Sequence, residues 1–139
     1  MNNIIEVIAR GLFIQDENLL VCHNTENLYA YLPGGHVEFG ESCEQALLRE
    51  WQEELACACQ VEKYLRHFED FFTDATGKKH HEYTFLYQVN CATLKLHYPF
   101  PHPEPDLFFD WIPMNEIRKH NILPTAIRDY IAELYRQKA

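Results

Sequence analysis

Glycine, proline and long apolar segments are all scarce in this chain. Only 5 glycines and 7 prolines occur among 139 residues, while 47% of the residues are hydrophobic. This composition excludes a fibrous or disordered chain and predicts a packed globular protein. No apolar run reaches the roughly 18 residues that a membrane-spanning helix needs, so we expect no membrane partner. The length predicts a single domain over residues 1–139.

Basic residues are also few. The chain has 12 Lys and Arg against 21 Asp and Glu, a net charge of −9. Affinity for a nucleic-acid backbone comes chiefly from Lys and Arg, so no long nucleic acid is expected as a partner. A small phosphorylated substrate is compatible with this charge if metal ions supply the positive charge at the site.

Cysteine is present in an odd number, which does not suggest a disulfide framework. The start of the chain has no uninterrupted secretory segment, because Glu6 and Arg10 break its apolar run. Cys57 and Cys59 lack a second ligand pair at the spacing of a zinc site. We therefore expect reduced thiols and a cytoplasmic protein. The five cysteines are Cys22, Cys43, Cys57, Cys59 and Cys91.

Apolar runs and turn residues predict several strands. A β-hairpin is expected from Ile4–Ile14 and Leu19–Cys22, and a short strand, Tyr29–Leu32, should end in the tight loop Pro33–Gly35. The other predicted strands and connections are the strands Gln60–Phe72, Glu82–Leu96 and Leu107–Ile112, the polar turn Thr73–Lys79 and the proline-dense loop Tyr98–Pro105.

Three helices are predicted between and after these strands. The first should span Cys43–Leu55, with Ser42 as N-cap and Gln45 completing a capping box. Its packing face is predicted to carry Leu48, Trp51 and Leu55. The other two are Asn115–His120 and Thr125–Gln137, the last with Ile127, Ile131 and Leu134 on one stripe. This order of elements predicts an α/β fold with a mixed sheet and helices on its faces.

The first predicted helix ends in an unusual concentration of charge. Glu50, Glu53 and Glu54 stand at i, i+3 and i+4, which places three carboxylates on one face within about one turn. Such a cluster costs stability unless a cation lies beside it. The spacing therefore predicts a divalent metal site.

The segment Gly35–Cys57 resembles the Nudix box, G-x5-E-x7-R-E-U-x-E-E-x-G-U, where U is a bulky apolar residue. Ala56 replaces the last glycine, and Cys57 is a small final apolar residue, so the helix is expected to end without the usual left-handed glycine. The six positions that match are Gly35, Glu41, Arg49, Glu50, Glu53 and Glu54. The resemblance implies a Nudix-type α/β/α sandwich that hydrolyses a nucleoside diphosphate linked to another moiety, with Mg²⁺ or Mn²⁺ as cofactor.

The same resemblance implies a role for each box residue. Glu50 and Glu54 are expected to be the principal metal ligands, and Glu53 a further ligand or the base that activates water. Glu41 should support the metal site, and Arg49 should be a counter-ion to these glutamates, with Glu41 as one candidate. The carbonyl of Gly34 or Gly35 is expected to add a metal ligand.

A further carboxylate is expected outside the box. Glu82 is preferred as this catalytic residue, and the alternatives are Glu104, Asp106 and Asp110. Each of the four is alternatively an ordinary surface charge.

Basic and aromatic residues supply the candidates for substrate binding. Lys79 and His81 belong to the basic run Lys78–His81, which either steers a phosphate to the site or forms a solvated hairpin tip. Arg10 is either a substrate contact or a surface ion pair. The aromatic candidates for base stacking, which are alternatively core residues, are Tyr29, Tyr31, Phe39 and Phe85.

Two other functions are compatible with such a domain. One is a nucleotide-binding or regulatory Nudix domain without turnover, although the intact box glutamates weigh against it. The other is an isoprenoid diphosphate isomerase, which needs elements usually found on a longer chain. The resemblance leaves the leaving group open, and it allows a homodimer without pointing to an interface.

Overall fold

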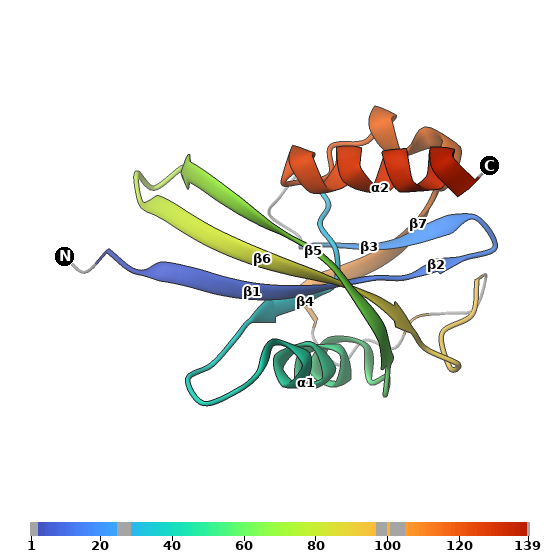
Figure 1. The fold of residues 1–139 in the computed structure, drawn as a ribbon, viewed down its shortest axis with the longest axis horizontal. Helices are drawn as coiled ribbons and strands as arrows, with labels where there is room; N and C mark the ends of the chain where they lie inside the picture. Colours follow the sequence, from blue (N-terminus) through green and yellow to red (C-terminus); the bar gives the residue numbers. More distant parts are fainter. Residues whose placement is uncertain (1–2, 25–28, 97–99, 101–104, 139) are drawn as a thin grey trace.

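The computed structural model of the chain describes residues 3–24, 29–96, 100 and 105–138. Figure 1 shows the strands in the middle, with α1 on one side and α2 on the other. The strands are β1 (Ile5–Leu12), β2 (Ile14–Gln15), β3 (Asn18–Asn24), β4 (Gly34–His36), β5 (Gln60–Thr73), β6 (Lys79–Asn90) and β7 (Leu107–Pro113). The helices are α1 (Cys43–Leu55), the 3₁₀ helix η1 (Met114–Lys119) and α2 (Thr125–Lys138).

The strands form two sheets. The larger has the order β4-β1-β6-β5, and its central strands β1 and β6 run parallel while the other pairs are antiparallel. The smaller is antiparallel, with the order β2-β3-β7. The predicted α/β fold with a mixed sheet is confirmed. The strands are divided between two sheets, whereas a single mixed sheet was predicted.

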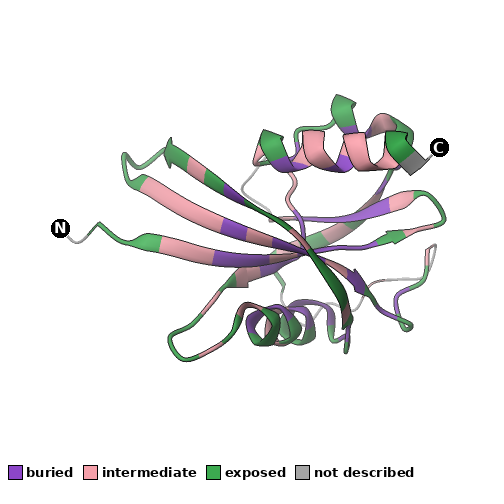
Figure 2. Cartoon of the chain, in the orientation of Figure 1, coloured by how far each residue is buried: buried purple, intermediate pink, exposed green. Residues whose placement is uncertain are grey.

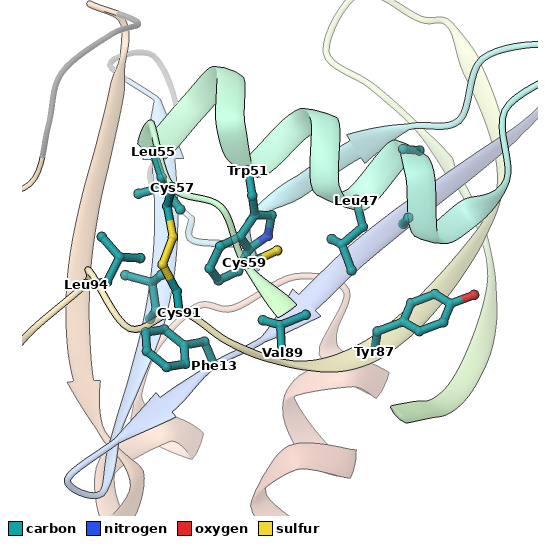
Figure 3. Close-up of a cluster of buried hydrophobic side chains, with 13 residues drawn as sticks. Phe13, Leu47, Trp51, Leu55, Cys57, Cys59, Tyr87, Val89, Cys91 and Leu94 are labelled. Atoms are coloured by element: carbon teal, nitrogen blue, oxygen red, sulfur yellow. A yellow bond between two sulfur atoms is a disulfide. The ribbon is translucent and has the colours of Figure 1, made fainter. Parts of the chain in front are cut away.

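Two hydrophobic clusters hold the helices to the strands. Under α1, Leu47, Trp51 and Leu55 pack with Phe13 and Val89 (Figure 3). On the side of α2 and η1, the buried residues include Leu12, Leu19, Leu86, Ile117, Ile127 and Ile131. Figure 2 shows that burial is concentrated where β1 and β6 pass between the helices, whereas the β5–β6 arm is largely exposed or half-buried. Each face of the larger sheet is therefore covered by one helical layer.

The predicted first hairpin is wrong for most of its length. Only the short β2 pairs with β3 in that way, with Ile14 opposite Leu19. β1 instead pairs with β4 and, over eight residue pairs, with the distant β6. Local apolar patterning could not reveal this, because parallel pairing joins segments that are far apart in the sequence.

The predicted strand Tyr29–Leu32 is also wrong. The structure gives only isolated bridges there, Cys22 to Tyr31 and Ala30 to Ile122, and the strand forms two residues later, as β4. Glycines weaken a strand in isolation, but here the backbone bonds of β1 hold them in place. β6 begins at Lys79 and ends at Asn90, earlier than predicted at both ends. Residues 98–99 and 101–104 of the predicted proline loop lie outside the described residues.

The predicted helix Cys43–Leu55 is confirmed, including its start. The Ser42 hydroxyl accepts a hydrogen bond from the Gln45 backbone N–H, and the Gln45 side chain accepts one from the Ser42 N–H. Two residues of the predicted packing face, Trp51 and Leu55, are fully buried, but Leu48 is 40% exposed and Leu47 is buried in its place. η1 and α2 fall where the last two helices were predicted, the first of them as a 3₁₀ helix.

The end of α1 differs from the expectation drawn from its missing glycine. Ala56 adopts the left-handed conformation itself, at φ 50° and ψ 39°, and its N–H donates to the Gln52 carbonyl. The geometry of the usual glycine cap is therefore kept by a residue whose Cβ makes that conformation unfavourable.

The expectation that all cysteines are reduced is wrong for two of them. Cys57, which follows α1, forms a disulfide with Cys91, which follows β6, and both are buried in the cluster under α1 (Figure 3). The two lie 34 residues apart, so no local pattern in the chain pairs them. Cys22, Cys43 and Cys59 are free thiols. The cytoplasmic location stays a prediction that the thiol argument no longer supports.

Within the described residues, no helix is both long enough and apolar enough to span a membrane.

Candidate metal and diphosphate site

The acidic face of α1 presents its three glutamates in different degrees of exposure. The Glu53 side chain is 50% exposed and that of Glu50 is 17% exposed. Glu54 is 9% exposed and counts among the buried residues of the helix. The helix spacing that the sequence predicted is thus realised, with one carboxylate turned to solvent and two partly or largely enclosed.

Arg49 links these carboxylates to the loop before the helix. Its guanidinium donates to both oxygens of Glu41, from Nε at 2.8 Å and from Nη2 at 3.0 Å. Nη1 donates to Glu50 at 3.0 Å and approaches Glu53 at 3.4 Å, and Nη2 also donates to the His36 carbonyl at 3.0 Å. One planar cation therefore fixes the positions of three box glutamates and the end of β4.

The charge states follow from this arrangement. The hydrogen bonds from Arg49, and then the backbone N–H of Glu38, lower the pKa of Glu41 from 4.5 to about 2. The pKa of Arg49 is raised, chiefly by Glu41 and also by Glu50. Both groups are therefore charged over the whole neutral range, so the pair keeps its geometry there.

The glycines before the helix have steric reasons to be glycine. A Cβ at Gly35 would stand 2.5 Å from the carboxyl carbon of Glu50. Gly34 has φ +150°, and a Cβ there would collide with the Ala9 carbonyl of β1. The indole of Trp51 donates to the adjacent Pro33 carbonyl at 3.2 Å, which ties this backbone to α1. The main chain at Gly35 and the Glu50 carboxylate thus approach each other too closely for a side chain to lie between them.

Arg10 lies on β1, directly opposite Gly34 in the pair that β1 forms with β4. Its Nη1 donates to the Leu32 carbonyl at 3.1 Å, and its guanidinium lies 5.0 Å from the centre of the Tyr31 ring. Burial is the main cause that raises the pKa of Tyr31. A hydrogen bond with Cys22 and the charge of Glu54 raise this pKa further. Arg10 also acts electrostatically on Glu82. Arg10 therefore interacts both with Tyr31, which is close enough to the acidic helix to be affected by Glu54, and with Glu82, the carboxylate predicted outside the box.

Glu82 lies in a group of acids and histidines on β1 and β6. It is aligned with Glu6 on the neighbouring parallel strand, and His80 Nδ1 lies 3.8 Å from its Oε2. Burial raises the pKa of Glu82, and the charge of Glu6 raises it further. His80 is thus part of an acidic cluster rather than of a solvated basic tip, since its side chain is only 14% exposed.

The structure does not bring the other two predicted substrate residues to the helix. Lys79 is exposed at the start of β6, at the tip of the β5–β6 arm (Figure 1). His81 bonds to Glu69 of β5 at 2.8 Å and packs against Phe71. Their part in substrate binding stays a prediction, and the contacts of His81 are those of a strand pair.

The remaining candidates are spread over the fold. Asp106 is exposed and Glu104 lies outside the described residues. Asp110 accepts a hydrogen bond from the Trp111 N–H and, with Tyr29, lines a cavity of about 320 Å³. Among the other aromatic candidates, Phe39 is fully exposed and Phe85 packs against the cluster under α1.

Comparison with known proteins identifies the family of this chain. A sequence profile of the NUDIX domain matches residues 6–134. The chain belongs to the Nudix family. A comparison with curated proteins gave no match.

Solved structures share the fold of this Nudix domain. The MutT protein from Methanosarcina mazei Go1 superposes with a TM-score of 0.70 at 19% identity, covering 99% of this chain and 98% of that one. A NUDIX hydrolase from Nitrosomonas europaea gives 0.64 at 23% identity, covering 99% and 90%. A UDP-X diphosphatase gives 0.66 at 18% identity, covering all of this chain and 66% of the other. Membership confirms the predicted family and the predicted type of enzyme, a Nudix pyrophosphohydrolase.

The donor set of this Nudix box fits a hard divalent cation. Glutamate and main-chain oxygens are the ligands that Mg²⁺ and Mn²⁺ prefer. Glu50 and Glu54 are partly or largely enclosed, and the glycine backbone leaves room at the Glu50 carboxylate that a Cβ would fill. These residues can therefore hold such an ion.

Two polar residues near the site were not predicted from the sequence. Glu6 was noted only as an interruption of an apolar run, and His36 not at all. Both join the group around Glu82, with His36 Nε2 2.9 Å from Glu6 Oε1. The available signal for Glu6 was its spacing from Arg10, because two polar residues four positions apart on an otherwise apolar strand face the same way.

Proposed function

We propose that the chain hydrolyses a diphosphate bond in a nucleoside diphosphate linked to another moiety, with Mg²⁺ or Mn²⁺ held at α1. The observation that carries this proposal is the contact of Gly35 with the Glu50 carboxylate beside the Arg49–Glu41 pair. The glutamate carboxylates, the Arg49 guanidinium and the main chain of Gly35 lie side by side. An acidic helix face that was merely solvated would not require this arrangement.

Glu50 and Glu54 would hold the metal, with Glu53 and the Gly34 carbonyl as further oxygen donors. When bound, the ion neutralises the diphosphate oxygens and lowers the pKa of a coordinated water. Glu53 is the most exposed of the three helix carboxylates, so we assign to it the removal of a proton from the attacking water. Arg49 holds Glu41, Glu50 and Glu53 in position.

Arg10 is the residue we assign to the substrate phosphates. It lies between Tyr31 and Glu82, and Tyr31 in turn lies 6.2 Å, ring to ring, from Tyr29. The cavity beside Tyr29 has a volume of about 320 Å³, room for part of a nucleoside. Glu82 is a partly buried carboxylate outside the box that interacts electrostatically with Arg10, and we assign to it the support of that guanidinium.

A screen for hydrolysis tests this function. It should include nucleoside triphosphates, oxidised nucleotides, nucleotide sugars, ADP-ribose, dinucleoside polyphosphates and capped RNA, each with Mg²⁺ or Mn²⁺ and with products identified. Nucleotide-linked compounds belong in it also because one neighbour in fold is a UDP-X diphosphatase.

We expect metal-dependent release of a product cut at a diphosphate bond. Glu53→Gln and Glu54→Gln should lower the rate by about 10²-fold or more, since each removes a group that acts on the water or the metal. Glu44→Gln, an exposed residue on the same helix, is the matched control and should retain the rate. Tight nucleotide binding with no turnover of any substrate would instead favour a regulatory domain.

A further inference from the structure

We propose that Glu6, His80 and Glu82 form a second cation site, selective for a borderline transition metal such as Zn²⁺ or Co²⁺. One ligand atom from each of the three residues can be chosen so that all lie within 4.8 Å of one another. Their side chains are 11%, 14% and 19% exposed, so they are mostly shielded yet within reach of solvent. Glu82 is also the carboxylate that we assign to the support of Arg10 in the function proposed above, but the second site is tested by metal binding and not by hydrolysis.

This cluster lies on the sheet face opposite α1. Side chains alternate between the two faces along a strand. In β1, Ala9 belongs to the cluster under α1, and a Cβ at Gly11 would touch Trp51. Glu6 is an odd number of residues from both, so it points to the other face, and Glu82 follows it because the two are aligned in the parallel ladder. The site is therefore separate from the glutamates of α1.

His80 is oriented for metal binding by an outer carboxylate. Its Nε2 lies 2.8 Å from Asp74 Oδ2, while Nδ1 faces Glu6 Oε2 at 2.9 Å and Glu82 at 3.8 Å. Donation of the Nε2 proton to Asp74 leaves Nδ1 as the ligand, which is the arrangement that commonly supports metal-bound histidine.

Asp74 and the imidazole ring are themselves fixed. The Oδ1 atom of Asp74 accepts hydrogen bonds from the Thr76 N–H at 2.9 Å, the Thr76 hydroxyl at 2.6 Å and the Lys78 N–H at 3.1 Å. The ring of His80 stacks on Phe72, with centroids 4.5 Å apart and planes 7° from parallel. A ligand held in this way loses little conformational entropy when a metal binds.

The charges of the cluster call for a cation. Glu6 and Glu82 are neighbouring carboxylates on adjacent strands, and the only cations in direct contact among the described residues are the imidazoles of His36 and His80 when protonated. A divalent ion can take the place of the histidine protons.

The ligand set indicates the class of metal. Two carboxylates with an imidazole suit Zn²⁺, Co²⁺ and similar ions better than Mg²⁺, which prefers oxygen alone. His36 is 62% exposed and its Nε2 lies 2.9 Å from Glu6, so it can supply a further nitrogen. The helix site, built of oxygen ligands, has the opposite preference.

Cobalt binding to the untagged 139-residue chain tests the proposal. The titration uses the Glu50→Gln/Glu54→Gln background, in which the helix site is disabled, and follows the visible absorption of bound Co²⁺ together with calorimetry of Zn²⁺. We expect one equivalent of either metal to bind, and we expect Mg²⁺ at millimolar concentration not to compete with it.

Two variants in this background assign the ligands. His80→Ala should abolish the tight Co²⁺ signal, and Asp74→Asn should weaken binding by about 10- to 100-fold while leaving the three ligands in place. His120→Ala, at an exposed histidine after η1, is the matched control. Circular dichroism of each variant without metal checks the fold. Absence of binding in the background protein, or binding unchanged in both His80→Ala and Asp74→Asn, would overturn the site.

Discussion

The guanidinium of Arg49 donates hydrogen bonds to both carboxylate oxygens of Glu41, at 2.8 and 3.0 Å, and so joins α1 to the loop that precedes it. The same guanidinium reaches Glu50 and the carbonyl of His36. The contact is bidentate, a geometry that lysine cannot reproduce. It ties the position of the acidic helix face to the end of β4.

This pair predicts a pH dependence of stability. The pKa of Glu41 is lowered from 4.5 to about 2, so its ionised form is favoured by folding. The contribution of the pair is therefore complete above pH 4.5 and is lost as the pH falls toward 2. Thermal unfolding of the wild type and of Glu41→Gln should show a constant difference in Tm at neutral pH, which shrinks in that acid window. A difference that grows on acidification would contradict the assignment.

Gly35→Ala should damage metal binding more than folding. The new Cβ would meet the Glu50 carboxyl carbon at 2.5 Å, so the carboxylate must move away from its position beside the backbone. A displacement of this size at a catalytic site can cost about 10²-fold in rate. Mg²⁺ dependence of the rate and calorimetric metal affinity measure the effect.

Gly40→Ala is the control for that substitution. A Cβ at Gly40 meets nothing within 4 Å, but φ is +83°, so this change should lower stability by about 1 kcal/mol and leave metal affinity unaltered. Equal metal affinity in the wild type and Gly35→Ala would show that Glu50 does not need its present position.

Ala56→Gly should stabilise the protein. Ala56 has φ 50°, and glycine carries no Cβ penalty there, a gain of about 1–2 kcal/mol that is partly offset by the greater entropy of glycine in the unfolded chain. We expect a net gain of about 0.5–1 kcal/mol in urea unfolding. Ala58→Gly, two residues on and without a positive φ, should give no gain. A loss of stability in Ala56→Gly would mean that the cap is not strained.

The Cys57–Cys91 disulfide should contribute to stability by closing a 34-residue separation. Loop closure of that size predicts a loss of about 4 kcal/mol on reduction. Urea unfolding with and without a thiol reductant measures it, and mass spectrometry after alkylation counts the free thiols. In Cys91→Ser the reductant should have no effect. Alkylation of all five cysteines in the native, unreduced protein would contradict the bond.

The sequence predicted those parts of the structure whose causes are local. Ser42 and Gln45 are close enough in the chain to define the start of α1, and the spacing of Glu50, Glu53 and Glu54 sets their common face. The family motif added roles to these residues. Such features need no knowledge of what packs against the helix.

The features that were missed depend on distant contacts. The pairing of β1 with β6 brings Glu6 beside Glu82, 76 positions apart, and no local pattern announces it. Gly34 and Gly35 form a strand only because β1 supplies the partner backbone. Cys57 and Cys91 meet because α1 lies over the end of β6. All three of these contacts depend on the order of the strands in the sheet, and that order depends on packing throughout the core.

The measurement that bears most directly on the proposed function is the rate of diphosphate hydrolysis in the wild type and Glu54→Gln at a series of Mg²⁺ concentrations. With the best substrate of the screen, the wild type should require the metal and cut at a diphosphate bond, and Glu54→Gln should lose about 10²-fold or more of that rate. A wild-type rate that does not depend on divalent ions would contradict the account. So would a Glu54→Gln rate equal to that of the wild type and of the control Glu44→Gln.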